Sequence, residues 1–276
     1  DEAMMNTCSL SPASRSRWRA FRVHKRPARG DPLAWHTSAV LSDAQRAALR
    51  AGMLSQGFAA LDEIMCAQTA RAARLELRGL FHRYGTRFTS ETHRAGIRSD
   101  LCQCLCEHEA NALGMHHTAS AIRMLKAIGH ELTRTFDEAF TVAPCAQIAC
   151  FPGGGTFYQR HGDNLYQPMD PSTAPSGFNN WRAFTILMYL NPAWTPDDGG
   201  CLRIYGECGG VPPLTPLPQH TLSAKSSFVD LEPLAGRVVV FNSLLHHEVM
   251  PVMGIRCALT IWIWKEDANR EKFGRS

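Results

Sequence analysis

The spacing of hydrophobic and polar positions changes along the chain near residue 143. Between residues 118 and 140, apolar residues recur at every third or fourth position, which predicts an amphipathic helix. A capping box of Ser42 and Gln45 predicts an earlier helix that runs to about residue 56. Residues 60–80 are rich in Ala, Leu, Arg and Glu and predict another helix, while residues 87–107 are typical of irregular chain with one or two strands.

From residue 143 onward, short apolar runs alternate with turns rich in glycine and proline. About eight short strands with turn signals between them predict a sandwich or jelly roll. We therefore expect an α+β, mainly β, fold in which the helices pack on one face of a sheet. The predicted strands are Gln147–Phe151, Thr156–His161, Ala183–Leu190, Gly200–Tyr205, Ser227–Leu231, Arg237–Phe241, Glu248–Met250 and Arg256–Trp264.

Length and charge predict one domain with short tails. The chain has 276 residues, enough for a single sizeable core. We expect a disordered basic tail at 1–32, one domain at 33–268 and a C-terminal tail at 269–276. Residues 1–30 hold seven Lys or Arg against two acidic residues, so the rest has a formal net charge of −1 and predicts no nucleic-acid groove. No run approaches the roughly 18 apolar residues of a membrane span, so we expect no membrane segment.

The ten cysteines are scattered along the chain, and the basic tail lacks the apolar core of a secretory signal. We therefore expect reduced thiols instead of a disulfide framework. Cys102, Cys104 and Cys106 alternate as on one face of a strand, a spacing that is not typical of a zinc finger.

The first candidate for chemistry is the stretch FPGGGTFYQRHGDN, which ends in His161 and Asp163. Residues i and i+2 of an extended backbone point the same way, so the imidazole and the carboxylate can converge on one point. They would supply two of the three ligands in the arrangement of two histidines and one carboxylate that suits non-haem Fe(II). Alone the pair is a weak signal, and a second stretch downstream strengthens it.

That second stretch, residues 237–264, contains adjacent histidines at 246 and 247 and then an alternating strand. One face of this strand carries Arg256, Ala258, Thr260 and two tryptophans, while the other is Cys, Leu and Ile. Arg256 makes sense if it points into a pocket and binds a carboxylate with its planar fork. A structural salt bridge is the alternative interpretation of this arginine.

In combination, these motifs resemble the Fe(II)/2-oxoglutarate dioxygenases, in particular the hypoxia-inducible-factor type of prolyl 4-hydroxylase. The sequence motifs that carry the resemblance include PGGGTFYQRHGDN, YLNPAW, GGCLRIY, DLEP and HHEVMPVMGIRCALTIW. The resemblance covers residues 143–264, with a weaker similarity at 96–100. The resemblance implies a double-stranded β-helix, or jelly roll, braced by helices, with the metal at one mouth. Collagen-type enzymes typically have Lys where Arg256 stands, so this residue favours the intracellular branch.

The resemblance also implies a role for each candidate residue. It implies Fe(II) at His161, Asp163 and His247, and we choose His247 over His246 because it heads the His-Glu-Val match and precedes Arg256 by nine residues. It further implies 2-oxoglutarate and O2 as co-substrates and allows ascorbate as an additional reductant. The residues implied at the cofactor are Arg256, Tyr189, Thr260, Leu202 and Tyr158; core filling is the alternative role for Thr260 and Leu202.

Some positions depart from the family pattern or add to it. Phe151 stands where these enzymes have Tyr, so one hydroxyl contact to the cofactor is missing. Asp100 and Arg182 fall where the family has a charged pair between a loop and the barrel mouth, which we expect to handle substrate. Leu165–Asn180 and Glu207–Ser226 are long predicted loops that either shape substrate entry or are tolerated surface insertions.

These features lead us to expect a prolyl 4-hydroxylase that acts on a proline in a regulatory protein, with a role in oxygen sensing. One alternative is an oxygenase that hydroxylates another residue or a small molecule. Another is a metal-binding jelly roll without catalysis, although such a module needs no carboxylate-binding arginine. We expect a protein or peptide substrate, a monomer, and a location in the cytoplasm or nucleus.

Overall fold

In the computed structural model, the described residues are 40–84, 96–136, 139–164, 182–208 and 228–265. All of them belong to one compact unit that spans residues 35–276. The limits expected for the domain, residues 33 and 268, lie outside the described part, so those boundaries stay predictions. None of the described helices is both long and apolar enough to cross a membrane.

Two antiparallel sheets form the core of the described residues, and apolar side chains from both sheets pack between them. The larger sheet runs in the order β1 (Phe58–Leu61), β9 (Val238–Asn242), β6 (Arg182–Tyr189), β11 (Arg256–Lys265), β4 (Cys145–Phe151) and β2 (Leu101–Cys106), and β3 (Phe140–Val142) also pairs with β11. The smaller sheet runs in the order β5 (Thr156–His161), β10 (Leu245–Val252), β7 (Leu202–Cys208) and β8 (Phe228–Leu231).

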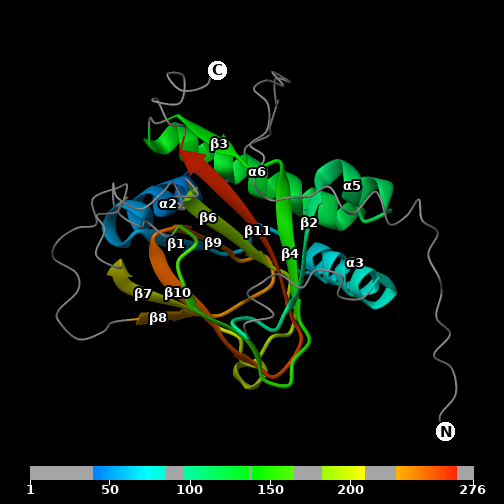
Figure 1. Ribbon diagram of the computed structural model, residues 1–276. Helices are drawn as coiled ribbons and strands as arrows, with labels where there is room; N and C mark the ends of the chain where they lie inside the picture. The colour runs from blue at the N-terminus through cyan, green and yellow to red at the C-terminus, as the bar shows by residue number, and fades with distance from the viewer. Residues whose placement is uncertain (1–39, 85–95, 137–138, 165–181, 209–227, 266–276) are drawn as a thin grey trace, which may run out of the picture. The chain divides into compact units, whose positions relative to one another are not determined.

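Helices cover the larger sheet on the side away from the smaller one (Figure 1). They are α2 (Asp43–Gln56), α3 (Ala67–Tyr84) and α6 (His116–Phe136), with α5 (Glu107–Ala112) packed on α6 and a single 3-10 turn at Pro196–Asp198. The Ser42–Gln45 capping box at α2 is present, as predicted. Two packed sheets with helices on one of them confirm the predicted α+β, mainly β, jelly-roll fold.

The helix cover explains why β11 is buried on both faces along its first eight residues. The Leu and Ile face of β11 packs under α6, whose apolar stripe includes Ile122 and Leu125. Gly129 allows the close approach, because a Cβ there would lie 2.7 Å from Ile263 Cδ1. The opposite face of β11, which begins with Arg256, points between the two sheets.

Two helix predictions had the wrong limits. The stretch predicted as a helix at 60–80 begins inside β1, and α3 starts only at Ala67. Residues 58–61 pair with β9, and so short an apolar run does not distinguish a strand from a helix. The helix predicted to reach Phe140 ends at Phe136, because Phe140 opens β3 along the edge of β11.

The expectation of reduced cysteines is wrong for one pair. Cys106 and Cys145 form a disulfide, since they are direct partners in the register of β2 and β4. They are 39 residues apart, so only the pairing of the strands brings them together. Cys102 and Cys104 lie on β2, as their alternation predicted, and are free thiols.

Candidate metal and cofactor site

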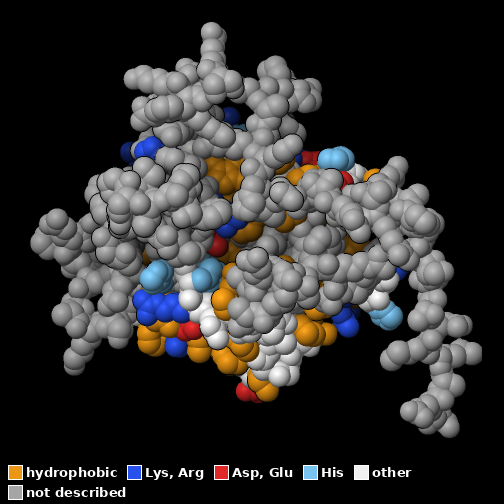
Figure 2. Space-filling model, viewed as in Figure 1, with side chains coloured by type: hydrophobic (Ala, Val, Ile, Leu, Met, Phe, Trp, Pro, Cys, Tyr) orange, Lys and Arg blue, Asp and Glu red, His pale blue; other side chains and the backbone are white. Residues whose placement is uncertain are grey.

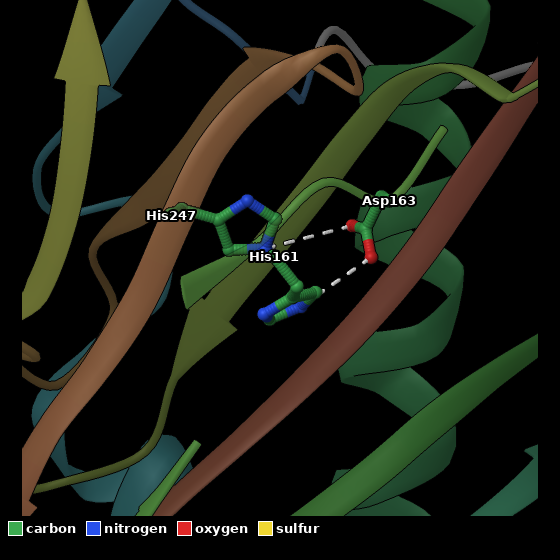
Figure 3. Close-up of side chains that lie close together, drawn as sticks. All are labelled: His161, Asp163 and His247. Carbon is green, nitrogen blue, oxygen red and sulfur yellow. Dashed lines mark ion pairs between the residues drawn. The ribbon is translucent and has the colours of Figure 1, made fainter. Parts of the chain in front are cut away.

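His161, Asp163 and His247 meet between the two sheets (Figure 3). His161 ends β5 and lies directly opposite His247 of β10 in the strand register, and Asp163 follows two residues after His161. One ligand atom from each residue lies within 4.8 Å of the others. The Asp163 carboxylate lies 3.8 Å from His161 Nε2 through Oδ1 and 3.9 Å from His247 Nε2 through Oδ2. The three side chains that the sequence analysis assigned to Fe(II), His161 and Asp163 from their spacing and His247 from the family resemblance, therefore lie together.

Backbone carbonyls fix the orientation of both imidazole rings. His161 Nδ1 lies 2.7 Å from the carbonyl of Gln159, and His247 Nδ1 lies 3.0 Å from that of Leu245. A carbonyl only accepts hydrogen bonds, so each Nδ1 carries the proton and each Nε2 offers a lone pair to the space beside Asp163. Such fixing of the second ring nitrogen is typical of metal-binding histidines.

The neighbouring His246 points elsewhere. Its Nδ1 lies 3.3 Å from Arg160 Nη2, and the Arg160 guanidinium also stacks on Tyr205. Figure 2 shows histidine and basic side chains together at the surface near β10 and β7. His247 is buried and faces the pocket, so of the two adjacent histidines it is the one placed to bind a metal.

The protonation states of His161 and Asp163 suit a cation. Burial, together with nearby His247, lowers the pKa of His161 to about 3, so its imidazole is neutral at pH 7. Burial alone would raise the pKa of Asp163, but His247, Arg182, His161 and a hydrogen bond from Thr185 hold it well below its ordinary value. A neutral imidazole and an ionised carboxylate are the forms that bind divalent iron.

A cavity extends from this cluster between the two sheets. Arg256 lies in its wall, 2% exposed, and donates from Nε to the carbonyl of Gly200 at 2.8 Å. Its Nη2 is buried and has no hydrogen-bond partner among the described residues, and the same holds for the hydroxyl of Tyr189. Tyr189 is fully buried, and this burial raises the pKa of its hydroxyl although the neighbouring Arg256 lowers it, so the hydroxyl stays a neutral donor.

These two orphaned donors fit an anionic ligand. Unpaired buried polar groups are costly and rare in native proteins, so a ligand oxygen is the natural partner. The far carboxylate of a dicarboxylic acid would accept from both Arg256 and Tyr189, while its other end would reach the metal ligands. The fold thus provides a metal-binding cluster and a carboxylate-binding end within one cavity, as Fe(II) and 2-oxoglutarate require.

The other residues predicted at the cofactor also surround this cavity. Thr260, Leu202 and Tyr158 line it, whereas Tyr189 lies behind the lining, beside Ala258 in the strand register. Tyr158 stacks on the His161 ring with 3.8 Å between the ring centres. Their roles towards a bound cofactor stay predictions, because the structure shows only their placement.

Asp100 and Arg182, the two residues expected at the barrel mouth, each contact other charged or aromatic side chains, and their role towards substrate stays a prediction. Arg98 donates to both oxygens of Asp100 at 2.6 Å, and both side chains are buried in the cavity wall. Arg182 stacks on Trp262, and its Nη1 lies 3.9 Å from Asp163 Oδ1. Arg98 lies in the stretch 96–100 that shares the family resemblance, but the sequence analysis gave it no role.

Two residues that sequence reasoning did not assign to the site donate hydrogen bonds to Asp163. Thr185 Oγ1 donates to Oδ2 at 2.6 Å, and Trp262 Nε1 donates to the same oxygen at 3.1 Å. Both lie on predicted strands, and they are direct partners in the register of β6 and β11. The alternation of side chains along each strand could have placed both residues in the pocket. It could not have identified Asp163 as their hydrogen-bond partner.

Comparison with known proteins agrees with this geometry. Residues 146–264 match the 2OG-Fe(II) oxygenase superfamily, whose members use Fe(II), 2-oxoglutarate and O2. This part of the chain is similar to a 2OG-Fe(II) oxygenase domain. The matched residues include all three members of the metal-binding cluster as well as Arg256 and Tyr189.

Several relatives are named as prolyl hydroxylases. The hypoxia-inducible factor prolyl hydroxylase of Caenorhabditis elegans is 29% identical over 205 residues, which are 72% of this chain and 24% of that protein. Human prolyl hydroxylase EGLN3 is 33% identical over 129 residues, which are 46% of this chain and 42% of that protein. The chain therefore spans less than half the length of these curated relatives.

Solved structures of similar fold include two prolyl hydroxylases. A Pseudomonas putida prolyl-4-hydroxylase is 26% identical with a TM-score of 0.55, over 80% of this chain and all of that one. A Trichoplax adhaerens prolyl hydroxylase, solved with a peptide fragment of a hypoxia-inducible factor oxygen degradation domain, has a TM-score of 0.58 over 84% of this chain and 93% of that one. At 20% identity the latter similarity concerns the fold alone.

Proposed function

We propose that the protein is an Fe(II)- and 2-oxoglutarate-dependent prolyl 4-hydroxylase that acts on a proline in a regulatory protein. The observation that carries this proposal is the unpaired Nη2 of Arg256, buried in the same cavity as His161, Asp163 and His247. A simple metal site would leave that donor unsatisfied, whereas a dicarboxylate co-substrate satisfies it. The names of the relatives support proline as the target.

In this proposal, His161, Asp163 and His247 hold Fe(II), which when bound activates O2 for attack on an unactivated C–H bond. The two Nδ1–H groups stay on backbone carbonyls, so both Nε2 lone pairs remain directed at the metal. Arg256 and Tyr189 bind the far carboxylate of 2-oxoglutarate and set its orientation. Leu202 and Val249 line the cavity with apolar surface, which excludes water and strengthens these polar contacts.

The two ends of the cavity differ in exposure, which supports separate entry of substrate and co-substrate. At the metal end, the side chains of His161 and Asp163 are 18% and 11% exposed, and that of His247 is 6% exposed. Arg256, by contrast, is 2% exposed and Tyr189 is fully buried. A proline in an extended peptide would therefore approach from the metal end, after 2-oxoglutarate has filled the deeper end. Most of the two predicted loops, 165–180 and 207–226, falls outside the described residues, so their role in peptide binding stays a prediction.

The direct test uses the purified protein with Fe(II), 2-oxoglutarate, O2 and a panel of proline-containing peptides. We expect mass spectrometry to find one added oxygen atom on proline, with an equal amount of succinate formed. Peptides with alanine in place of that proline are the control and should gain no oxygen. Oxygen on another residue would identify a different peptidyl hydroxylase, and metal binding without succinate would identify a non-catalytic metal module.

We also propose a location in the cytoplasm or nucleus, supported by Arg256, the residue expected of the intracellular branch. The Cys106–Cys145 disulfide opposes it, because disulfides persist mainly in oxidising compartments. Trapping of free thiols in protein taken directly from cells tests this point. A reduced pair in the cell supports the intracellular location, and an oxidised pair overturns it.

A further inference from the structure

Two buried hydroxyl groups form a chain of hydrogen bonds that ends at the Asp163 carboxylate. Thr185 Oγ1 donates to Asp163 Oδ2 at 2.6 Å, and Ser243 Oγ lies 2.9 Å from Thr185 Oγ1. Thr185 lies on β6 and Ser243 follows β9 in a turn, and their exposed fractions are 1% and 0%. Trp262 Nε1 donates to the same oxygen, Oδ2, at 3.1 Å.

The direction of this chain of hydroxyls follows from donor counting. Asp163 is ionised, so its carboxylate can only accept, and Thr185 must give its single hydroxyl proton to Oδ2. In its contact with Ser243, Thr185 can then only accept, so the Ser243 hydroxyl donates. Ser243 therefore supports the bond from Thr185 to Asp163, because an O–H that accepts a hydrogen bond is a stronger donor.

The backbone around Ser243 makes the arrangement rigid. The Ser243 N–H donates to the carbonyl of Ala183 at 3.0 Å, and its carbonyl accepts from the N–H of Asn164 at 2.9 Å. Ala183 is two residues before Thr185, and Asn164 directly follows Asp163. One turn residue thus fixes both the strand that carries the threonine and the segment that carries the carboxylate.

We propose that Thr185, with Ser243 behind it, is a positioning residue that sets the orientation of Asp163 for the metal. Oδ2 accepts from both Thr185 and Trp262, which together use its two lone pairs. The oxygen that binds the metal is then Oδ1, and the carboxylate binds through one oxygen. This inference rests on the proposed metal site and adds residues to it that neither the motif nor the family match singled out.

The test measures Co(II) binding to the metal-free protein by calorimetry, with the visible spectrum of bound Co(II) as a second readout. Thr185→Val removes the hydroxyl at constant volume, and we expect the Kd for Co(II) to rise about 10- to 100-fold, as for other groups that hold metal ligands. Thr185→Ser keeps the donor and should keep the Kd. Ser243→Ala should raise the Kd less, and should have no further effect in the Thr185→Val background, because it acts through that threonine.

Thr118 provides a matched control outside the cavity. It is a fully buried threonine of α6 whose Oγ1 donates to Glu76 Oε2 at 2.7 Å, the same kind of contact without a metal ligand. Thr118→Val should lower the melting temperature and leave the Kd for Co(II) and the spectrum unchanged. An unchanged Kd in Thr185→Val, or equal shifts in both variants, would overturn the positioning role. Absence of Co(II) binding to the unmodified protein would instead refute the proposed function on which the inference rests.

Discussion

Substitution of Arg256 is the most direct test of the carboxylate-binding end of the cavity. Arg256 opens β11, donates from Nε to the carbonyl of Gly200, and lies between the rings of Phe151 and Tyr189, each 5.0 Å from its Cζ. Its Nη2 is the group left for a ligand. Lysine has one nitrogen, so it cannot satisfy the Gly200 carbonyl and reach the ligand together.

The magnitude follows from the contacts that each substitution removes. Arg256→Lys keeps the charge and loses one charge-assisted hydrogen bond, which is worth about 1.5–3 kcal/mol. Since about 1.4 kcal/mol is a factor of ten, the KM for 2-oxoglutarate should rise about 10- to 100-fold. Arg256→Ala removes the only cationic partner that we propose for the ligand carboxylate, a loss of about 3–5 kcal/mol, so its effect should be larger than that of lysine.

The assay is succinate formation at saturating Fe(II) as a function of 2-oxoglutarate concentration. Arg203→Lys is the matched control, because Arg203 donates to both oxygens of Asp230 at 2.8 Å between β7 and β8 and does not line the cavity. It should leave the KM for 2-oxoglutarate unchanged. If both substitutions at Arg256 also leave the KM unchanged, this residue does not bind the co-substrate, and the argument from its unpaired nitrogen fails.

Other predictions concern the metal cluster, the cavity wall and the packing of the helices. His247→Ala should abolish both Co(II) binding and turnover, whereas His246→Ala should retain both; the reverse result would mean that the ligand is the other histidine. Phe151→Tyr should lower the KM for 2-oxoglutarate, because a hydroxyl added beside the arginine gives the carboxylate another donor; a raised KM would show that the wall has no room for it. Gly129→Ala should destabilise the protein by about 1–3 kcal/mol in urea unfolding, because its Cβ would collide with a side chain of β11. Gly79→Ala should instead stabilise the protein by up to about 1 kcal/mol, because this glycine lies in a helix and nothing lies within 4 Å of the added Cβ. If both substitutions change the free energy of unfolding in the same direction, close packing at Gly129 does not explain the result.

Strand alternation made much of the site predictable. His161 and Asp163 converge because they are two residues apart at the end of β5, and Arg256 and Thr260 share the inward face of β11. Such relations depend only on the period of a strand, so the sequence contains them. The family resemblance then supplied the distant partner, His247, which the pattern alone did not separate from its neighbour.

Contacts that depend on how strands are ordered could not be predicted in the same way. Ser243 lies in a turn and reaches Thr185 only because β6 and β9 are neighbours in the larger sheet. The Cys106–Cys145 disulfide likewise requires the register of β2 with β4. The short strand β1 was taken for helix, because four apolar residues carry too little periodicity to decide and its partner β9 is far away in sequence.

The two sheets supply different side chains to the site, and this explains why the hydrogen bonds to Asp163 come from outside its own strand. The smaller sheet supplies both imidazoles, from β5 and β10, whereas the larger sheet supplies Arg256 from β11. Asp163 follows a strand of the smaller sheet, yet its hydrogen bonds from Thr185 and Trp262 come from the larger one. Through these hydrogen bonds, Asp163 connects the metal ligands of the smaller sheet to β11, the strand of the larger sheet that carries Arg256. A change in how the sheets pack should disturb metal and co-substrate together, because the carboxylate connects both.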